Sequence, residues 1–190
     1  QRANDLLAAA LRRSGPNPEM AELLGELAFE RGDLPSAERY FRQVVRWDDH
    51  NVGAHLYLGT ILVDSGREAE GGPELERAAA LSPEGFLPHF ALGAMHARAG
   101  RAAEARVHLQ RALEREKMPQ AYCLLGVVEL EAERAGAAVE ALEHAVALEE
   151  EFEEAIYYLG LAYLERGWHR KALESFRRVL AIDPQRLQYQ

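Results

Sequence analysis

The chain lacks several residue types and patterns that particular protein classes need. It has one cysteine in 190 residues, which excludes an internal disulfide framework and a zinc site built from several cysteines. No apolar run approaches the roughly 18 residues that cross a bilayer, so the sequence predicts no membrane-spanning helix. Basic residues number 22 against 31 acidic ones, for a net charge of -9, and only Lys117 and Lys171 are lysines. Because nucleic-acid binders draw affinity from Lys and Arg on phosphates, this balance argues against a nucleic-acid partner.

The residues that are present favour a folded, helical chain. Apolar residues make up 48% of the sequence, whereas disordered chains are poor in them. Ala, Arg, Leu and Glu are abundant while Val and Ile are scarce, and the abundant types lose little side-chain freedom in a helix. A chain of this length suits one compact domain or a short repeat array.

A Leu-Gly pair recurs along the chain, with its glycines 34, 34, 33 and 34 residues apart. The five glycines are Gly25, Gly59, Gly93, Gly126 and Gly160. Twelve residues after each comes a small residue: Ala37, Gly71, Ala105, Ala138 and Ala172. Four residues further on is a bulky one: Phe41, Leu75, Leu109, Leu142 and Phe176. A second glycine follows the first by seven residues in four of the five units: Gly32, Gly66, Gly100 and Gly167.

This pattern predicts two helices in each unit. Apolar residues spaced three and four apart form one helix face, and the second glycine supplies the turn between the two helices. The small residues mark where the two helices approach closely, and the bulky residues fill the space between them. One such pair buries too little apolar surface to fold alone, so neighbouring units must stack.

The repeat resembles the tetratricopeptide repeat, most closely in the last unit. That unit carries the family's residues at Leu159, Gly160, Tyr163, Gly167, Ala172, Phe176, Leu180 and Pro184. The resemblance implies an all-α, right-handed superhelical solenoid of antiparallel helix pairs. Its five units are expected at 18–51, 52–85, 86–118, 119–152 and 153–186. Residues 1–17 are expected to form the second helix of a truncated leading unit, and residues 187–190 to begin a truncated following element.

Two departures from the repeat predict local irregularities. Gly71, Gly72 and Pro73 fall where a second helix should already be running, and proline suits only a first helical turn, so we expect that helix to start near Pro73. In the fourth unit Glu133 replaces the turn glycine and Gly136 follows three residues later, so we expect the turn to be displaced.

In tetratricopeptide arrays the first helix of each pair lines a concave groove that binds a peptide or helix of a partner. The resemblance assigns five groove positions in the first unit: Glu19, Glu22, Glu26, Phe29 and Glu30. Carboxylates spaced three and four apart repel one another by roughly 0.2–0.5 kcal/mol per pair, so helix stability alone does not select them. Two interpretations stay open, a cation-binding end of the groove and an ordinary solvated acidic face.

In the later units the corresponding positions are mostly apolar. They hold Leu56, Thr60, Val63, Phe90, Ala94, Cys123, Val127, Tyr157 and Leu161, and we add the neighbouring Tyr158. A contiguous exposed apolar stripe commonly marks an interaction surface, although superhelical closure or a neighbouring chain could instead bury it. Phe90, Tyr157 and Tyr158 are the expected energetic centres, since aromatic side chains dominate truncation scans.

The predicted function is therefore a protein-interaction scaffold or adaptor without catalysis or cofactor. Its expected partner is an amphipathic helix or extended segment with apolar anchors and Arg or Lys towards the first unit. The alternatives are a recruitment arm of a larger enzyme or of a secretion or pilus machine, and self-association through the ends of the array. We expect a cytoplasmic protein and interpret the chain as a segment of a longer one.

Three specialised functions of related repeats fit this sequence poorly. A carboxylate clamp needs Lys, Arg and Asn in the groove, where this chain has Glu22, Glu26 and Tyr57. The array of the glycosyltransferase type uses a ladder of asparagines in its groove, but this chain contains only Asn4, Asn17 and Asn51. A pentatricopeptide-type RNA binder has a similar period but needs a basic groove.

Candidate catalytic and metal-binding residues are few. His55 and His89 occupy one slot of adjacent units, which a metal site could use, but that slot normally holds a packing residue and no carboxylate or Cys stands at ligand spacing. Cys123 has no neighbouring base in the sequence, so an activated thiolate has little support. The sequence predicts no metal and no catalytic residues.

Overall fold

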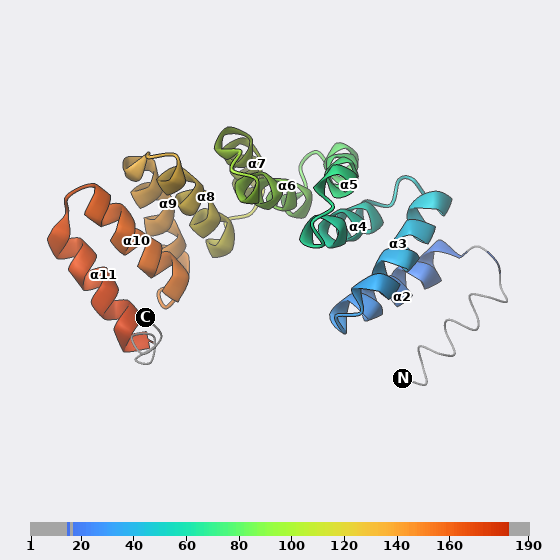
Figure 1. Cartoon of the computed structure of the whole chain (residues 1–190), viewed down its shortest axis with the longest axis horizontal. Helices are drawn as coiled ribbons and strands as arrows, with labels where there is room; N and C mark the ends of the chain where they lie inside the picture. Colours follow the sequence, from blue (N-terminus) through green and yellow to red (C-terminus); the bar gives the residue numbers. More distant parts are fainter. Residues whose placement is uncertain (1–14, 16, 183–190) are drawn as a thin grey trace. The chain divides into compact units, whose positions relative to one another are not determined.

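The computed structural model describes residue 15 and residues 17–182. This part of the chain forms helices and no strands, which confirms the predicted all-α class (Figure 1). The helices are α2 (Pro18–Glu30), α3 (Leu34–Trp47), α4 (Val52–Asp64), α5 (Glu68–Leu81), α6 (Phe86–Arg98), α7 (Ala102–Arg115), α8 (Pro119–Glu131), α9 (Ala135–Leu148), α10 (Glu153–Glu165) and α11 (His169–Ile182). The predicted leading half-unit and following element fall outside the described residues, apart from Gly15 and Asn17.

The chain divides into two compact halves, Gln1–Ala91 and Leu92–Gln190. In the first half α2 packs on α3, α3 on α4, and α4 on α5. In the second, α7 packs on α8, α8 on α9, α9 on α10, and α10 on α11. First helices of 13 residues alternate with second helices of 14, joined by short turns.

The helices of a pair touch at the glycine of the Leu-Gly motif. A Cβ atom added to Gly25 would lie 2.9 Å from the Phe41 ring, and one on Gly59 would lie 2.7 Å from the side chain of Leu75. The same relation joins Gly93 to Leu109, Gly126 to Leu142 and Gly160 to Phe176. The periodic bulky residue therefore occupies the space that each glycine leaves empty, as the sequence predicts.

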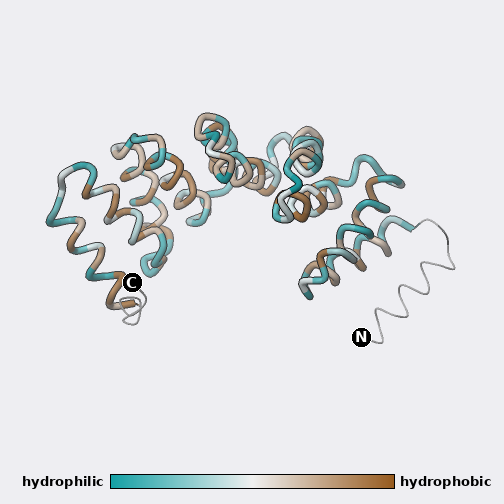
Figure 2. The backbone as a smooth tube through the Cα atoms, viewed as in Figure 1, coloured by the Kyte–Doolittle hydropathy of each residue, from teal (hydrophilic) through white to brown (hydrophobic). Residues whose placement is uncertain are grey.

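The helices of the array differ in hydropathy. The first helices α4 and α8 are more hydrophobic along their length than the second helices α3 and α7 (Figure 2). Helices α4 and α8 each pack against the preceding and the following helix, as α3 and α9 also do, so more than one face of each is buried.

The turn of the fourth unit is not displaced, so that prediction was wrong. Helix α9 begins at Ala135, and Gly136 lies inside it. Glu133 itself adopts the left-handed conformation, with φ 57°, that glycines adopt at φ 69–77° in the other turns. Its amide donates to the Leu130 carbonyl as the Gly32 amide does to the Phe29 carbonyl. The helix ends impose this geometry even where a side chain makes it unfavourable.

The second helix of the second unit does not start late either. Helix α5 begins at Glu68 and continues through Pro73. Gly71 and Gly72 are buried, and a Cβ on Gly71 would lie 2.7 Å from the carbonyl oxygen of Gly59 on α4. This close helix contact holds the segment in the helical conformation despite its glycines and proline.

Ion pairs join successive units across their second helices and turns. Arg42 of α3 pairs with Glu70 of α5 at 2.8 Å, and Arg67 binds Glu38. Arg77 of α5 pairs at 2.5 Å with Asp49, which lies in the turn between α3 and α4. These contacts lie on elements other than the first helices, so they leave the candidate groove face to other residues.

Candidate functional site

Tyr57 of α4 lies close to the acidic positions predicted in the first unit. Its ring stacks on Phe41 of α3, with ring centroids 4.8 Å apart, and meets Phe29 of α2 edge-on at 5.2 Å. Burial raises the pKa of the Tyr57 hydroxyl, and the nearby carboxylates of α2 raise it further. Those carboxylates are Glu26, Glu30 and Glu22. The structure thus brings four of the five predicted positions of α2 around one aromatic side chain.

Glu22 is held in place by the next repeat. Its Oε2 accepts a hydrogen bond of 2.9 Å from Asn51 Nδ2, and Asn51 Oδ1 accepts the Ala54 amide at 2.7 Å, which caps α4. Glu22 is half-buried, as are Glu26 and Phe29, whereas Glu19 and Glu30 are exposed. The acidic face therefore combines the anchored carboxylate of Glu22 and the half-buried Glu26 with the exposed Glu19 and Glu30.

Tyr158 of α10 occupies the same slot in the last unit, two residues before the glycine of the Leu-Gly pair. Burial raises its pKa most, and Glu154, Cys123, Tyr157 and Glu131 add to the rise. Glu154 belongs to α10 itself, whereas Glu131 ends α8. The two tyrosines thus share a repeat slot, partial burial and nearby carboxylates.

The remaining predicted positions are mostly half-buried on the first helices. Leu56, Thr60, Val63, Phe90, Ala94, Val127, Tyr157 and Leu161 are all of this kind. The Phe90 ring stacks on Phe86 at 5.5 Å, and the Tyr157 ring lies 5.5 Å from that of Tyr158. Their partial exposure leaves them accessible to a ligand without making any of them a fully exposed apolar side chain.

Cys123 is an exception among the predicted groove residues. Only 3% of it is exposed, and it belongs to the core cluster that includes Leu142 and Leu159. Burial raises the pKa of its thiol to about 12, with a smaller contribution from Glu154. The thiol is therefore protonated at neutral pH and packs inside the unit, so we correct its assignment as a contact residue.

Sequence reasoning did not assign Tyr57 to the groove. It noted Tyr57 only as a residue that departs from a carboxylate clamp, while Tyr158, in the same slot, was singled out. Comparing the two copies of that slot would have found it. The acidic surroundings of Tyr57 were less accessible to sequence reasoning, because they come from the neighbouring repeat.

His55 and His89 are packing residues with hydrogen bonds, only 4% and 3% exposed. His55 Nδ1 lies 2.6 Å from Glu74 Oε2 and its Nε2 lies 3.2 Å from the Asp49 carbonyl oxygen. His89 Nε2 lies 2.9 Å from the Pro83 carbonyl oxygen, six residues earlier, as in the His55 pair. Among the residues that the structure describes, no three His, Cys, Asp or Glu side chains are placed to hold a metal ion.

Within the described residues no helix is both long and apolar enough to cross a membrane. This finding agrees with the lack of long apolar runs in the sequence.

Three family models described as tetratricopeptide repeat match the chain. One matches residues 1–52, 24–86 and 56–122, a second matches 119–152, and a third matches 153–186. Together these matches cover most of the 190 residues.

Among curated proteins, the chain is 36% identical over 75 residues to serine/threonine-protein phosphatase T of Trypanosoma brucei brucei (strain 927/4 GUTat10.1). The match spans 40% of this chain and 16% of the phosphatase. The chain therefore corresponds to a small part of that protein's length.

Among solved structures, the fold is similar to a crystal structure of MamA protein, with a TM-score of 0.78 and 25% identity over 91% of this chain and 95% of that one. It is also similar to YrrB, described as a TPR protein with an unusual peptide-binding site, with a TM-score of 0.78 and 18% identity. That likeness covers 95% of this chain and 94% of YrrB and is one of fold.

Proposed function

Because the chain belongs to the tetratricopeptide-repeat family, we propose that it is a protein-interaction module that binds a segment of a partner on its first helices. The observation that carries this proposal is that Tyr57 and Tyr158 occupy the same slot on the first helices of two repeats and are both partly exposed. Each has carboxylates nearby. Both rings also pack against the buried core of their own part of the chain, which holds them in place on the first helices.

The proposed partner is an amphipathic segment with both apolar and basic residues. Carboxylates around Tyr57 favour Arg or Lys, and the aromatic faces of Tyr57 and Phe29 can accept a cation as well. In the second half of the chain, Val127, Tyr157 and Leu161 offer apolar contacts beside Tyr158. Helix recognition in a groove works through anchors spaced in this way.

The proposed role is binding rather than catalysis. The one thiol is buried and protonated at neutral pH. The two buried histidines are engaged by backbone carbonyls and, at His55, by Glu74. These groups are occupied by structural contacts, which supports a module that recognises a partner and performs no chemistry on it.

The proposal can be tested with two labelled helical peptides that share one leucine face and differ in charge. One peptide carries Lys and the other Glu on its polar face, and fluorescence anisotropy measures the dissociation constant at several salt concentrations. We expect the Lys peptide to bind more tightly and to weaken as salt screens the carboxylates. Glu26→Lys with Glu30→Lys should weaken the Lys peptide by about tenfold, about 1.4 kcal/mol, and reduce its salt dependence.

Two further variants distinguish binding on the first helices from a general effect of charge. Glu76→Lys places a positive charge on an exposed position of α5, away from the first helices, and should leave binding nearly unchanged. Phe90→Ala with Tyr157→Ala removes apolar contacts and should weaken both peptides. Equal affinity of all these variants for the Lys peptide would overturn the proposal.

A second candidate function is a recruitment arm of a larger enzyme. The match to serine/threonine-protein phosphatase T favours it, because that protein is much longer than the segment it shares with this chain. An antibody against this chain, used on denatured extract of the source cell, would report the mass of the native polypeptide. A mass well above 21.2 kDa, with a catalytic region identified by peptide sequencing, would support the arm.

The predicted self-association through the array ends falls largely on residues outside the described part of the chain. It stays a prediction, and light scattering at several concentrations tests it.

A further inference from the structure

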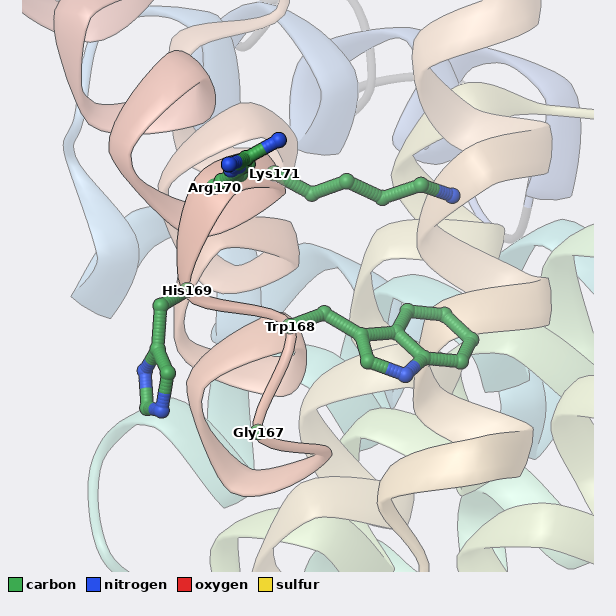
Figure 3. Close-up of a pocket in the computed structure, with 5 residues that line it drawn as sticks. All are labelled: Gly167, Trp168, His169, Arg170 and Lys171. Carbon is green, nitrogen blue, oxygen red and sulfur yellow. The ribbon is translucent and has the colours of Figure 1, made fainter.

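The turn between α10 and α11 forms a hollow of about 590 Å³ lined by five consecutive residues, Gly167 to Lys171. Trp168 stands in this hollow with 41% of its surface exposed. Figure 3 shows that Trp168 and Lys171 extend to the same side of the start of α11, whereas His169 points away. A large aromatic side chain thus lies next to a lysine on the surface of the last repeat.

Cations surround the exposed indole. The Lys171 Nζ lies 5.0 Å from the centre of the Trp168 ring, and the Arg166 guanidinium carbon lies 5.2 Å from it. Arg170 lines the same hollow. The nearest carboxylate recorded at these cations belongs to Glu143, whose Oε1 is 3.9 Å from Lys171 Nζ and accepts the Tyr163 hydroxyl at 2.7 Å. Glu174 also lies close to Tyr163, next to Trp168, but the three cations outnumber these two carboxylates, so the hollow is positively charged.

The other four repeats show that the fold does not need these residues. The slot of Trp168 holds Asp33, Arg67, Arg101 and Arg134, and the slot of Lys171 holds Ser36, Glu70, Glu104 and Ala137. At three of those turns the arginine contacts a side chain of the preceding helices: Arg67 with Glu38, Arg101 with His96, and Arg134 with Glu129. Only the last unit replaces that internal contact with an exposed tryptophan and a lysine.

The region around the hollow is basic, although the chain as a whole is acidic. Residues 166–178 contain five Lys and Arg and one Glu, a net charge of +4, whereas the whole chain carries -9. The hollow also lies at the start of α11, a helix of 14 residues, and the first amide groups of a helix favour negative charge. Both effects would attract an anion to the indole.

From these observations we infer that the hollow at the α10–α11 turn is a second binding surface, which takes an acidic peptide segment. An apolar side chain of that segment packs on Trp168, and its carboxylates bind Arg170 and Lys171. The acidic residues that flank the patch, including Glu143 and Glu174, disfavour an extended polyphosphate and suit a short segment. The surface lies on a different element from Tyr158 and has the opposite charge preference, so it does not rest on the proposed function.

Tryptophan fluorescence gives a readout specific to this hollow. The chain has two tryptophans, so Trp47→Phe leaves Trp168 as the only indole. The probe is a pool of short peptides with Glu at alternate positions and Phe or Leu between them, and a matched pool with Lys in place of Glu is the control. We expect a saturable change in indole emission with the Glu pool only, and weaker binding as salt is added.

The test variant combines Arg170→Ala with Lys171→Glu. It introduces the residues that the repeat 52–85 has in these two slots, Ala69 and Glu70. Because that unit folds with them, we expect the variant to fold and to bind the Glu pool at least tenfold more weakly. Arg111→Glu on the exposed side of α7 is the matched control for general charge and should change affinity by less than twofold. The Lys peptide of the first test should bind the Arg170/Lys171 variant as it binds the wild type.

Three results would overturn the inference. The first is no emission change with the Glu pool at millimolar concentration, or equal affinity of the test variant and wild type. The second is tighter binding of a single-stranded oligonucleotide than of the Glu pool in the same titration. The third is a concentration-dependent mass in light scattering that Trp168→Arg abolishes, which would make the patch a contact between copies of this chain.

Discussion

The Tyr57 ring lies parallel to the Phe41 ring, with centroids 4.8 Å apart and an angle of 6° between the planes. Phe41 is fully buried and fills the space opposite Gly25, so its position is set by the packing of α2 on α3. Tyr57 belongs to the next repeat. The packed core of one repeat therefore fixes the position of a candidate binding residue on the first helix of the next repeat.

Shortening Tyr57 should affect both stability and binding, whereas removing its hydroxyl should affect binding alone. Tyr57→Ala loses the contacts with Phe41 and Phe29, and we expect it to lower the free energy of unfolding by about 1–3 kcal/mol. Tyr57→Phe keeps the stacked ring and should stay within about 0.5 kcal/mol of wild type. Urea denaturation followed by circular dichroism measures both, and an equal loss in the two variants would contradict the stacking role.

Glu38 should make the stability of the first half of the chain depend on pH. Its pKa is lowered from the ordinary value of 4.5, chiefly by the hydrogen bond from Arg67 and also by that from Arg42. A lowered pKa in the folded state means that the carboxylate stabilises the fold above about pH 4.5, and that this contribution is lost as the pH falls through the lowered pKa.

Glu38→Gln removes this titration. The loss of unfolding free energy between pH 7 and pH 3 should therefore be smaller in Glu38→Gln than in wild type, and Arg67→Gln should reduce it as well. Urea midpoints at the two pH values provide the measurement. Parallel pH curves for wild type and both variants would show that the pair does not stabilise the fold.

Two glycines of the same repeat should respond to alanine with opposite signs. A Cβ on Gly126 would overlap the side chain of Leu142, so Gly126→Ala should destabilise by about 1–3 kcal/mol through overpacking. A Cβ on Gly136 would come no closer than 3.9 Å to Arg166, and alanine favours the helix, so Gly136→Ala should stabilise by up to about 1 kcal/mol. Thermal melting of the two variants decides the sign.

Glu133 should be improved by the residue that the other turns use. Its φ of 57° is unfavourable for a side chain, so Glu133→Gly should stabilise the protein by about 0.5–1 kcal/mol. The reverse change at an equivalent turn, Gly100→Glu, should destabilise it by a similar amount. A destabilised Glu133→Gly would mean that the Glu133 side chain contributes more than its backbone conformation costs.

Much of the fold followed from particular repeated residues. Gly25, Ala37 and Phe41 recur with one period, and their spacing places them at one contact between two helices. Glu133 and Pro73 were misjudged because local propensity was weighed without the packing that overrides it. For the site, the assignment of the acidic positions of α2 to a groove stays a prediction. The burial of Cys123 was not predicted, since a groove slot and a core slot are neighbours on one helix.

The sequence by itself determined the helix pairs and the residues at which they meet, because a helix turn of 3.6 residues converts spacing directly into a shared face. Only the tertiary structure decided which side chains of different repeats come together. Glu22, Glu26 and Glu30 of α2 lie near Tyr57 of α4, and Arg42 of α3 pairs with Glu70 of α5. Such contacts depend on how far and at what angle neighbouring helices pack, and that geometry is set by the summed volumes of many buried side chains rather than by any one spacing.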